Sequence, residues 1–107
     1  MSSVPIVILD YGVGNLLSIQ NAIAQFKGVS IITSNLIELE KAQKVILPGV
    51  GSFPTAMKKL RELDLVSAIK KYANSGRPLL GICLGMQLLF EVSQEFGETE
   101  GLGLIGG

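Results

Sequence analysis

The chain has 107 residues, 48% hydrophobic and 17% charged, which is typical of one folded domain and not of a disordered segment. Nine basic and nine acidic residues cancel, so nothing indicates binding to nucleic acid or to an anionic membrane. One cysteine and no histidine exclude an internal disulfide and leave no metal-binding spacing. The N-terminus lacks the basic start of a signal peptide, and no apolar run approaches the ~18 residues of a membrane helix. We therefore expect a soluble cytoplasmic protein without a metal or cofactor.

Strand-like apolar runs alternate with amphipathic helical patterns along the whole chain. The predicted strands are residues 6–9, 29–33, 45–47 and 79–82, with a candidate fifth around 102–105. The predicted helices lie over 16–26, 36–39, 53–63, 65–73 and 84–92. Their boundaries are marked by N-capping residues and by glycines expected to end them, namely Asn15, Asn35, Ser52, Gly28 and Gly76.

This alternation predicts a single α/β domain over residues 1–107, a three-layer α/β/α arrangement around a mostly parallel sheet. Loops at 11–15, 48–51 and 81–85 directly follow predicted strands, so they are expected to meet at the carboxyl edge of that sheet, where ligands bind. The last candidate strand has no helix to cover it. The fold therefore reads as incomplete at its C-terminal end.

Cys83 stands between Gly81 and Gly85, where a predicted strand turns into a predicted helix. Such a turn holds its central residue strained and exposed, and a helix start offers N–H groups that stabilise a thiolate. The alternative is a buried core cysteine, the usual place of an intracellular thiol. The flanking glycines favour a nucleophile, since neither a core strand nor a helix start gains stability from glycine.

A Pro-Gly loop at 48–51 ends the third predicted strand. It is either a tight turn into the next helix or an oxyanion hole, in which glycine-flanked N–H groups face a developing negative charge. The candidate donors are the loop amides together with the amide after the cysteine, that is Gly49, Val50, Gly51 and Leu84. Gln87 lies one helical turn after Cys83 and is either a substrate contact or an ordinary exposed glutamine.

The loop at 10–15 has two glycines but lacks the third glycine of a dinucleotide-binding motif, so it is a weak cofactor signal. A turn in which Asn15 caps the following helix is the simpler interpretation.

Three segments, 81–90, 46–53 and 10–16, together resemble the class I (triad) glutamine amidotransferases, whose fold is flavodoxin-like. Within that family they are most similar to the glutaminase subunits of imidazole glycerol phosphate synthase in histidine biosynthesis. The resemblance covers essentially all 107 residues in order.

The resemblance implies that Cys83 attacks L-glutamine, forms a thioester and releases glutamate and ammonia. It implies oxyanion or substrate contacts at Gly49, Val50, Gly51 and Leu84, and a substrate contact at Gln87. The loop with Gly14 and Asn15 then faces a cyclase subunit, a (β/α)8 barrel that receives the ammonia.

In this family the catalytic histidine and glutamate lie in the C-terminal half, and this chain contains no histidine. We therefore expect the N-terminal half of such a subunit, truncated, proteolysed or encoded by a shortened gene, and nearly inactive by itself. One alternative keeps the fold alone, as a non-catalytic module that docks a partner. Another stays within the family, as an ammonia donor for a sugar-modifying amidotransferase. A third, a one-domain cysteine hydrolase or chaperone, is disfavoured because Leu84 stands where that family has histidine.

Overall fold

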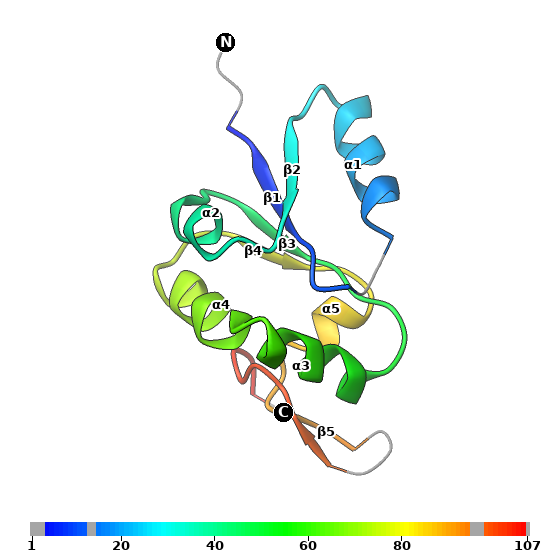
Figure 1. Ribbon diagram of the computed structural model, residues 1–107, viewed down its shortest axis with the longest axis vertical. Coiled ribbons are helices and arrows are strands. Elements are labelled where there is room, and N and C mark those ends of the chain that lie inside the picture. Colours follow the sequence, from blue (N-terminus) through cyan, green and yellow to red (C-terminus); the bar gives the residue numbers. More distant parts are fainter. Residues whose placement is uncertain (1–3, 13–14, 95–97, 107) are drawn as a thin grey trace.

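The computed structural model describes residues 4–12, 15–94 and 98–106. Its centre is a four-stranded sheet in which all neighbours pair in parallel, in the order β2-β1-β3-β4 (Figure 1). The strands are β1 Ile6–Leu9, β2 Ser30–Thr33, β3 Val45–Leu47 and β4 Leu79–Gly81. The parallel α/β architecture expected from the sequence is confirmed, with β4 at one edge of the sheet.

The described residues form five helices: α1 Leu16–Gln25, α2 Leu36–Lys41, α3 Phe53–Glu62, α4 Leu65–Asn74 and α5 Leu84–Gln87. The first four lie in the connections between successive strands, and α5 follows β4. Three of them begin where capping was predicted, because the side chains of Asn15, Asn35 and Ser52 accept hydrogen bonds from first-turn N–H groups. The end of α1 differs from the prediction. Lys27, with φ +63°, and not Gly28 takes the left-handed conformation after this helix.

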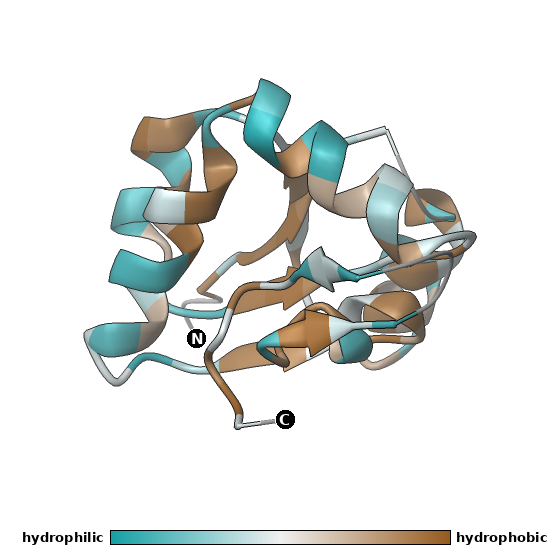
Figure 2. Ribbon diagram, turned by 90° about the horizontal axis from the view of Figure 1, so that it is seen from below, coloured by the Kyte–Doolittle hydropathy of each residue, from teal (hydrophilic) through white to brown (hydrophobic). Residues whose placement is uncertain are grey.

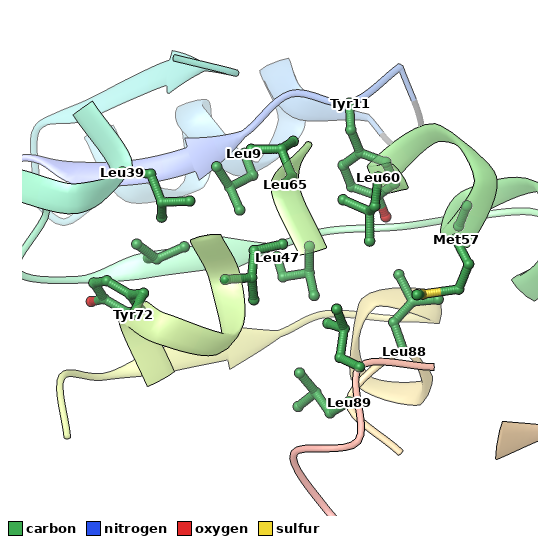
Figure 3. Close-up of a cluster of buried hydrophobic side chains, with 14 of the residues drawn as sticks. Leu9, Tyr11, Leu39, Leu47, Met57, Leu60, Leu65, Tyr72, Leu88 and Leu89 are labelled. Atoms are coloured by element: carbon green, nitrogen blue, oxygen red, sulfur yellow. The ribbon is translucent and has the colours of Figure 1, made fainter. Parts of the chain in front are cut away.

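The two faces of the sheet are covered unequally. Val7, Leu9 and Leu47 point to the face on which α2, α3, α4 and α5 build the main hydrophobic core (Figure 3). Ile8 and Ile46 point to the opposite face, where Figure 1 shows α1 apart from the other helices. Figure 2 shows the apolar strands in brown and much of the outward helix surface in teal. The structure thus has its three layers, with a single helix in one of them.

The C-terminal part departs from the predicted pattern. Helix α5 is a single turn and does not extend over 84–92, and the chain instead forms a hairpin of β5 Val92–Ser93 and β6 Thr99–Glu100. The candidate strand at 102–105 is absent apart from one bridge between Ile105 and Phe90. The cause is a contact with a later segment: the carbonyl groups of Leu88, Leu89 and Phe90 accept hydrogen bonds from the N–H groups of residues 102–105, and so cannot continue a helix.

An apolar hollow remains open between α1 and the β3–β4 side of the sheet. It is lined mostly by aliphatic and aromatic side chains, among them Ile23, Phe26, Ile46, Leu80 and Ile82. The side chain of Leu80 is 57% exposed and that of Phe26 is 87% exposed. Within the described ranges, no helix is long and apolar enough to cross a membrane.

Leu80→Lys tests how weakly this face contributes to stability. Since Leu80 is already more than half exposed on an edge strand, we expect the free energy of unfolding to change by less than ~1 kcal/mol. Binding of a fluorescent apolar dye should fall. Leu47→Ala is the control on the opposite face and should cost ~2–5 kcal/mol, because Leu47 is fully buried. If urea unfolding showed equal losses of unfolding free energy for the two variants, the two faces of the sheet would not be covered unequally by helices.

Candidate active site

Cys83 occupies the turn between β4 and α5 with φ +55° and ψ −125°, and its side chain is exposed. A residue with a Cβ rarely adopts positive φ, so the backbone stores strain at this position. Two other non-glycine residues of the described chain share this feature, Lys27 and Asp64, and both lie beside helix ends. The strained, exposed turn expected from the sequence is therefore present.

The two glycines around Cys83 are explained by close backbone contacts. A Cβ on Gly85 would overlap the carbonyl oxygen of Leu47, and a Cβ on Gly81 would lie 2.7 Å from the Cα of Met86. Real side chains do not approach backbone atoms so closely. Gly85 thus lets the elbow, residues 81–85, pack directly against the end of β3, and Gly81 lets the start of α5 fold back onto β4.

The loop of residues 48–51, called the oxyanion loop after the role predicted from the sequence, lies against the elbow. The N–H of Ile82 donates to the carbonyl of Leu47 at 3.0 Å, and the N–H of Leu84 donates to the carbonyl of Gly49 at 2.9 Å. The Tyr11 hydroxyl donates to the carbonyl of Pro48. The three predicted loops therefore do meet at the carboxyl edge of the sheet, as far as they are described. Gly14 lies outside the described residues.

The backbone amides at the start of α5 are occupied. The N–H groups of Leu84, Gly85 and Met86 donate to the carbonyls of Gly49, Ile82 and Cys83 respectively, at 2.9–3.0 Å. The sequence had suggested free amides at this helix start, and a one-turn helix also carries little dipole. The carbonyl of Gly49 thus faces the elbow, and the N–H of Val50, on the same planar peptide, points the other way.

The remaining predicted site residues lie around this edge. Val50, Gly51 and Gln87 are exposed, and Gly51 adopts φ +95° with open space beside it. Asn15 is also exposed, and its side chain caps α1 through the N–H of Ser18. Among the described residues, no group of three or more histidine, cysteine or acidic side chains could hold a metal ion.

Tyr11 is a residue of this site that the sequence did not single out. It lies two residues beyond the end of β1, is 2% exposed, and lies near Leu60 in the core (Figure 3). Burial raises the pKa of its hydroxyl well above the usual range, so Tyr11 is a permanent donor. The available signal was its position, an aromatic residue at the carboxyl end of a buried strand.

The family model described as "Glutamine amidotransferase class-I" matches residues 7–99. The chain belongs to this family. It is 55% identical over 102 residues to "Imidazole glycerol phosphate synthase subunit HisH" of Sulfurimonas denitrificans and 52% identical to the subunit of that name in Bacillus cereus. A third relative, "Imidazole glycerol phosphate synthase subunit HisH 1" of Legionella pneumophila, is 51% identical over all 107 residues.

These matches cover 95% of this chain for the first two relatives and 100% for the third, but 49% of each relative. The class-I glutamine amidotransferase chain therefore spans about half the length of the curated relatives it matches. The matched half corresponds to the N-terminal half predicted from the sequence.

Gly85→Ala tests the packing of the elbow in this glutamine amidotransferase chain. The new methyl group meets the carbonyl of Leu47, so we expect a loss of about 3 kcal/mol in the free energy of unfolding. Gly106→Ala is the control, because the nearest atom to its Cβ is a Glu91 carboxylate oxygen at 3.9 Å. It should change stability by less than ~0.5 kcal/mol in the same denaturant titration. Similar values for both variants would argue against the close approach.

Alkaline titration tests the burial of the two tyrosines, the only ones in the chain. Burial raises the pKa of Tyr11 and of Tyr72, and the Arg77 guanidinium over the Tyr72 ring offsets part of the latter shift. Unfolded tyrosines ionise near pH ~10. Below that pH these groups leave stability unchanged. Above it, the unfolded state releases its protons first, and stability falls by up to ~1.4 kcal/mol per pH unit per tyrosine.

Tyrosinate absorbance should therefore appear together with the loss of circular dichroism, not before it. Tyrosinate that forms near pH ~10 while the fold persists would contradict the burial of these hydroxyls.

Proposed function

We propose that this chain carries the nucleophile, oxyanion loop and substrate contacts of a glutaminase that hydrolyses L-glutamine to glutamate and ammonia. The observation that carries the proposal is the position of Cys83, which is exposed at positive φ between two close-packed glycines. The next residue, Leu84, ties this turn to the 48–51 loop by a hydrogen bond from its N–H to the Gly49 carbonyl. Family membership and the names of the relatives support the same chemistry.

The reaction begins when Sγ of Cys83 attacks the side-chain amide carbon of glutamine, which forms a C–S bond and an oxyanion. The C–N bond then breaks, the nitrogen takes up a proton and leaves as ammonia, and a γ-glutamyl thioester remains. Water attacks the thioester, releasing glutamate and the thiol of Cys83. No cofactor or metal is needed for any of these steps.

The oxyanion is stabilised by backbone N–H groups of the loop and the elbow, from Gly49, Val50, Gly51 and Leu84. In the structure the Gly49 carbonyl occupies the Leu84 amide. An oxyanion bound there replaces this carbonyl, and rotation of the Gly49–Val50 peptide brings the N–H of Val50 to the same side. Gln87 contacts the substrate from α5.

The proton transfers need a base that this chain does not provide, because it contains no histidine. We propose that the base and its orienting carboxylate belong to a second half of the domain, in line with relatives of about twice the length. Within the whole protein, ammonia passes in the cytoplasm to a cyclase subunit with a (β/α)8 barrel, for imidazole glycerol phosphate synthesis. The loop with Gly14 and Asn15 faces that cyclase.

Turnover by the purified chain tests the need for an outside base. Loss of general acid–base catalysis lowers the reaction rate ~10²–10⁴-fold. The rate of glutamate release by the purified chain should therefore equal the rate with Cys83→Ala within error. Cys83-dependent turnover by the 107-residue chain would contradict this part of the proposal.

Covalent labelling tests the nucleophile itself. A chloromethyl ketone analogue of glutamine should alkylate Cys83 about tenfold faster, relative to iodoacetamide, than it alkylates N-acetylcysteine, because the site orients it and stabilises its oxyanion. Mass spectrometry locates the adduct, and Cys83→Ala should block it. Absence of this preference, together with co-elution with the cyclase subunit of Sulfurimonas denitrificans, would favour a docking module without glutaminase chemistry.

A further inference from the structure

The hydroxyl of Tyr11 is a fixed donor inside the site. Its ring belongs to the main hydrophobic core, and it is 2% exposed. The loop presses against it: a Cβ on Gly49 would lie 2.7 Å from the Tyr11 oxygen and 2.9 Å from the amide nitrogen of Gly85. Gly49 is therefore held between β1's end on one side and the elbow on the other.

Two successive peptides of the oxyanion loop are fixed by different partners. The Pro48 carbonyl accepts from the Tyr11 hydroxyl, and the Gly49 carbonyl accepts from the N–H of Leu84. The described chain has no cis peptide bonds, so the Pro48 carbonyl and the Gly49 N–H point in opposite directions. Holding that carbonyl therefore fixes where the Gly49 amide points.

The Leu84 bond is the one that an oxyanion displaces, whereas the Tyr11 bond lies on the preceding peptide and survives this exchange. We propose that Tyr11 is a positioning residue for the oxyanion loop: its hydroxyl holds the Pro48–Gly49 peptide in place while the Leu84 amide changes partner. This inference rests on the proposed glutaminase function of Cys83. It assigns Tyr11 no contact with the substrate.

The test compares two alkylating reagents on Cys83. The chloromethyl ketone analogue of glutamine passes through a tetrahedral oxyanion, whereas iodoacetamide loses iodide in a direct displacement without one. The ratio of their second-order rate constants therefore reports the oxyanion loop and cancels changes in thiol exposure. For Tyr11→Phe we expect the ratio to fall about tenfold, less than the ~10²–10³-fold that deletion of an oxyanion donor costs.

Tyr72→Phe is a matched control. Tyr72 is the other buried tyrosine, and its hydroxyl likewise donates to a proline carbonyl, that of Pro78, at 2.7 Å. Loss of the Tyr72 hydroxyl should lower the melting temperature about as much as Tyr11→Phe does. It should leave the ratio of the two alkylation rate constants within twofold of the value for the unmodified chain. An unchanged ratio in Tyr11→Phe, or an equal fall in Tyr72→Phe, overturns the proposal.

A second measurement does not depend on the folding of Tyr11→Phe. In the Tyr72→Phe background Tyr11 is the only tyrosine, so its hydroxyl proton can be assigned by NMR before and after labelling with the ketone. We expect the proton to remain hydrogen-bonded in the adduct, and its loss there overturns the proposal. If the unmodified chain has the same ketone-to-iodoacetamide ratio as N-acetylcysteine, the glutaminase function fails first, and this inference falls with it.

Discussion

The candidate site depends on how closely the elbow approaches the end of β3. Strands β3 and β4 pair in parallel, and the pairing continues beyond them, as Ile82 donates to Leu47 and Leu84 donates to Gly49. The continuation is sterically open only because residue 85 has no side chain. It places Cys83 at the carboxyl edge of the sheet, just beyond the end of β4, and its side chain is exposed. Core packing behind the sheet and reactivity at its edge thus share one set of backbone contacts.

The sequence predicted this arrangement well where its signals were local. Apolar runs located β1 to β4, and capping side chains located the starts of α1, α2 and α3. It failed where a distant segment decided the outcome. The pattern after Gln87 reads as an amphipathic helix, but residues 102–105 take the carbonyls that such a helix requires. The role of Tyr11 is not predictable from local pattern for the same reason, because the Pro48 carbonyl that accepts its hydrogen bond is 37 residues away. Hydrophobic periodicity predicts the short-range hydrogen bonds within a helix. It does not predict which distant segment pairs with a turn, or which carbonyl accepts a hydrogen bond from a buried hydroxyl.

The unequal faces of the sheet show a second long-range limit. Ile8 and Ile46 have the same apolar character as Val7 and Leu47, and the sequence treats both sets as buried strand residues. In the structure α1 shields Ile8 completely, yet leaves Leu80 largely exposed farther along the same face. The apolar residues of the strands therefore predict that both faces of the sheet are suited to burial. The number of helices that pack on each face decides what fraction of its side-chain surface is buried. The stability of the chain rests mainly on the face that carries α3 and α4.

The proposed division of catalytic groups between this chain and a second half of the domain follows from the same sheet edge. The proposed nucleophile and oxyanion loop both follow from one crossover, because β3 and β4 end side by side and place the 48–51 loop against the elbow that carries Cys83. A general base cannot be supplied in this way, since it needs a titrating side chain within hydrogen-bond reach of Sγ, and no histidine is present in the chain. In these residues the exposed turn at Cys83 is in place, but of the amides proposed to bind the oxyanion, that of Leu84 is occupied and that of Val50 points away from the elbow. The proposed acylation therefore needs both a rearrangement of the 48–51 loop and a proton donor for the leaving nitrogen. An alkylating reagent that carries its own leaving group needs no proton on a leaving nitrogen, so it reports the thiol of Cys83 and the 48–51 loop without the missing base.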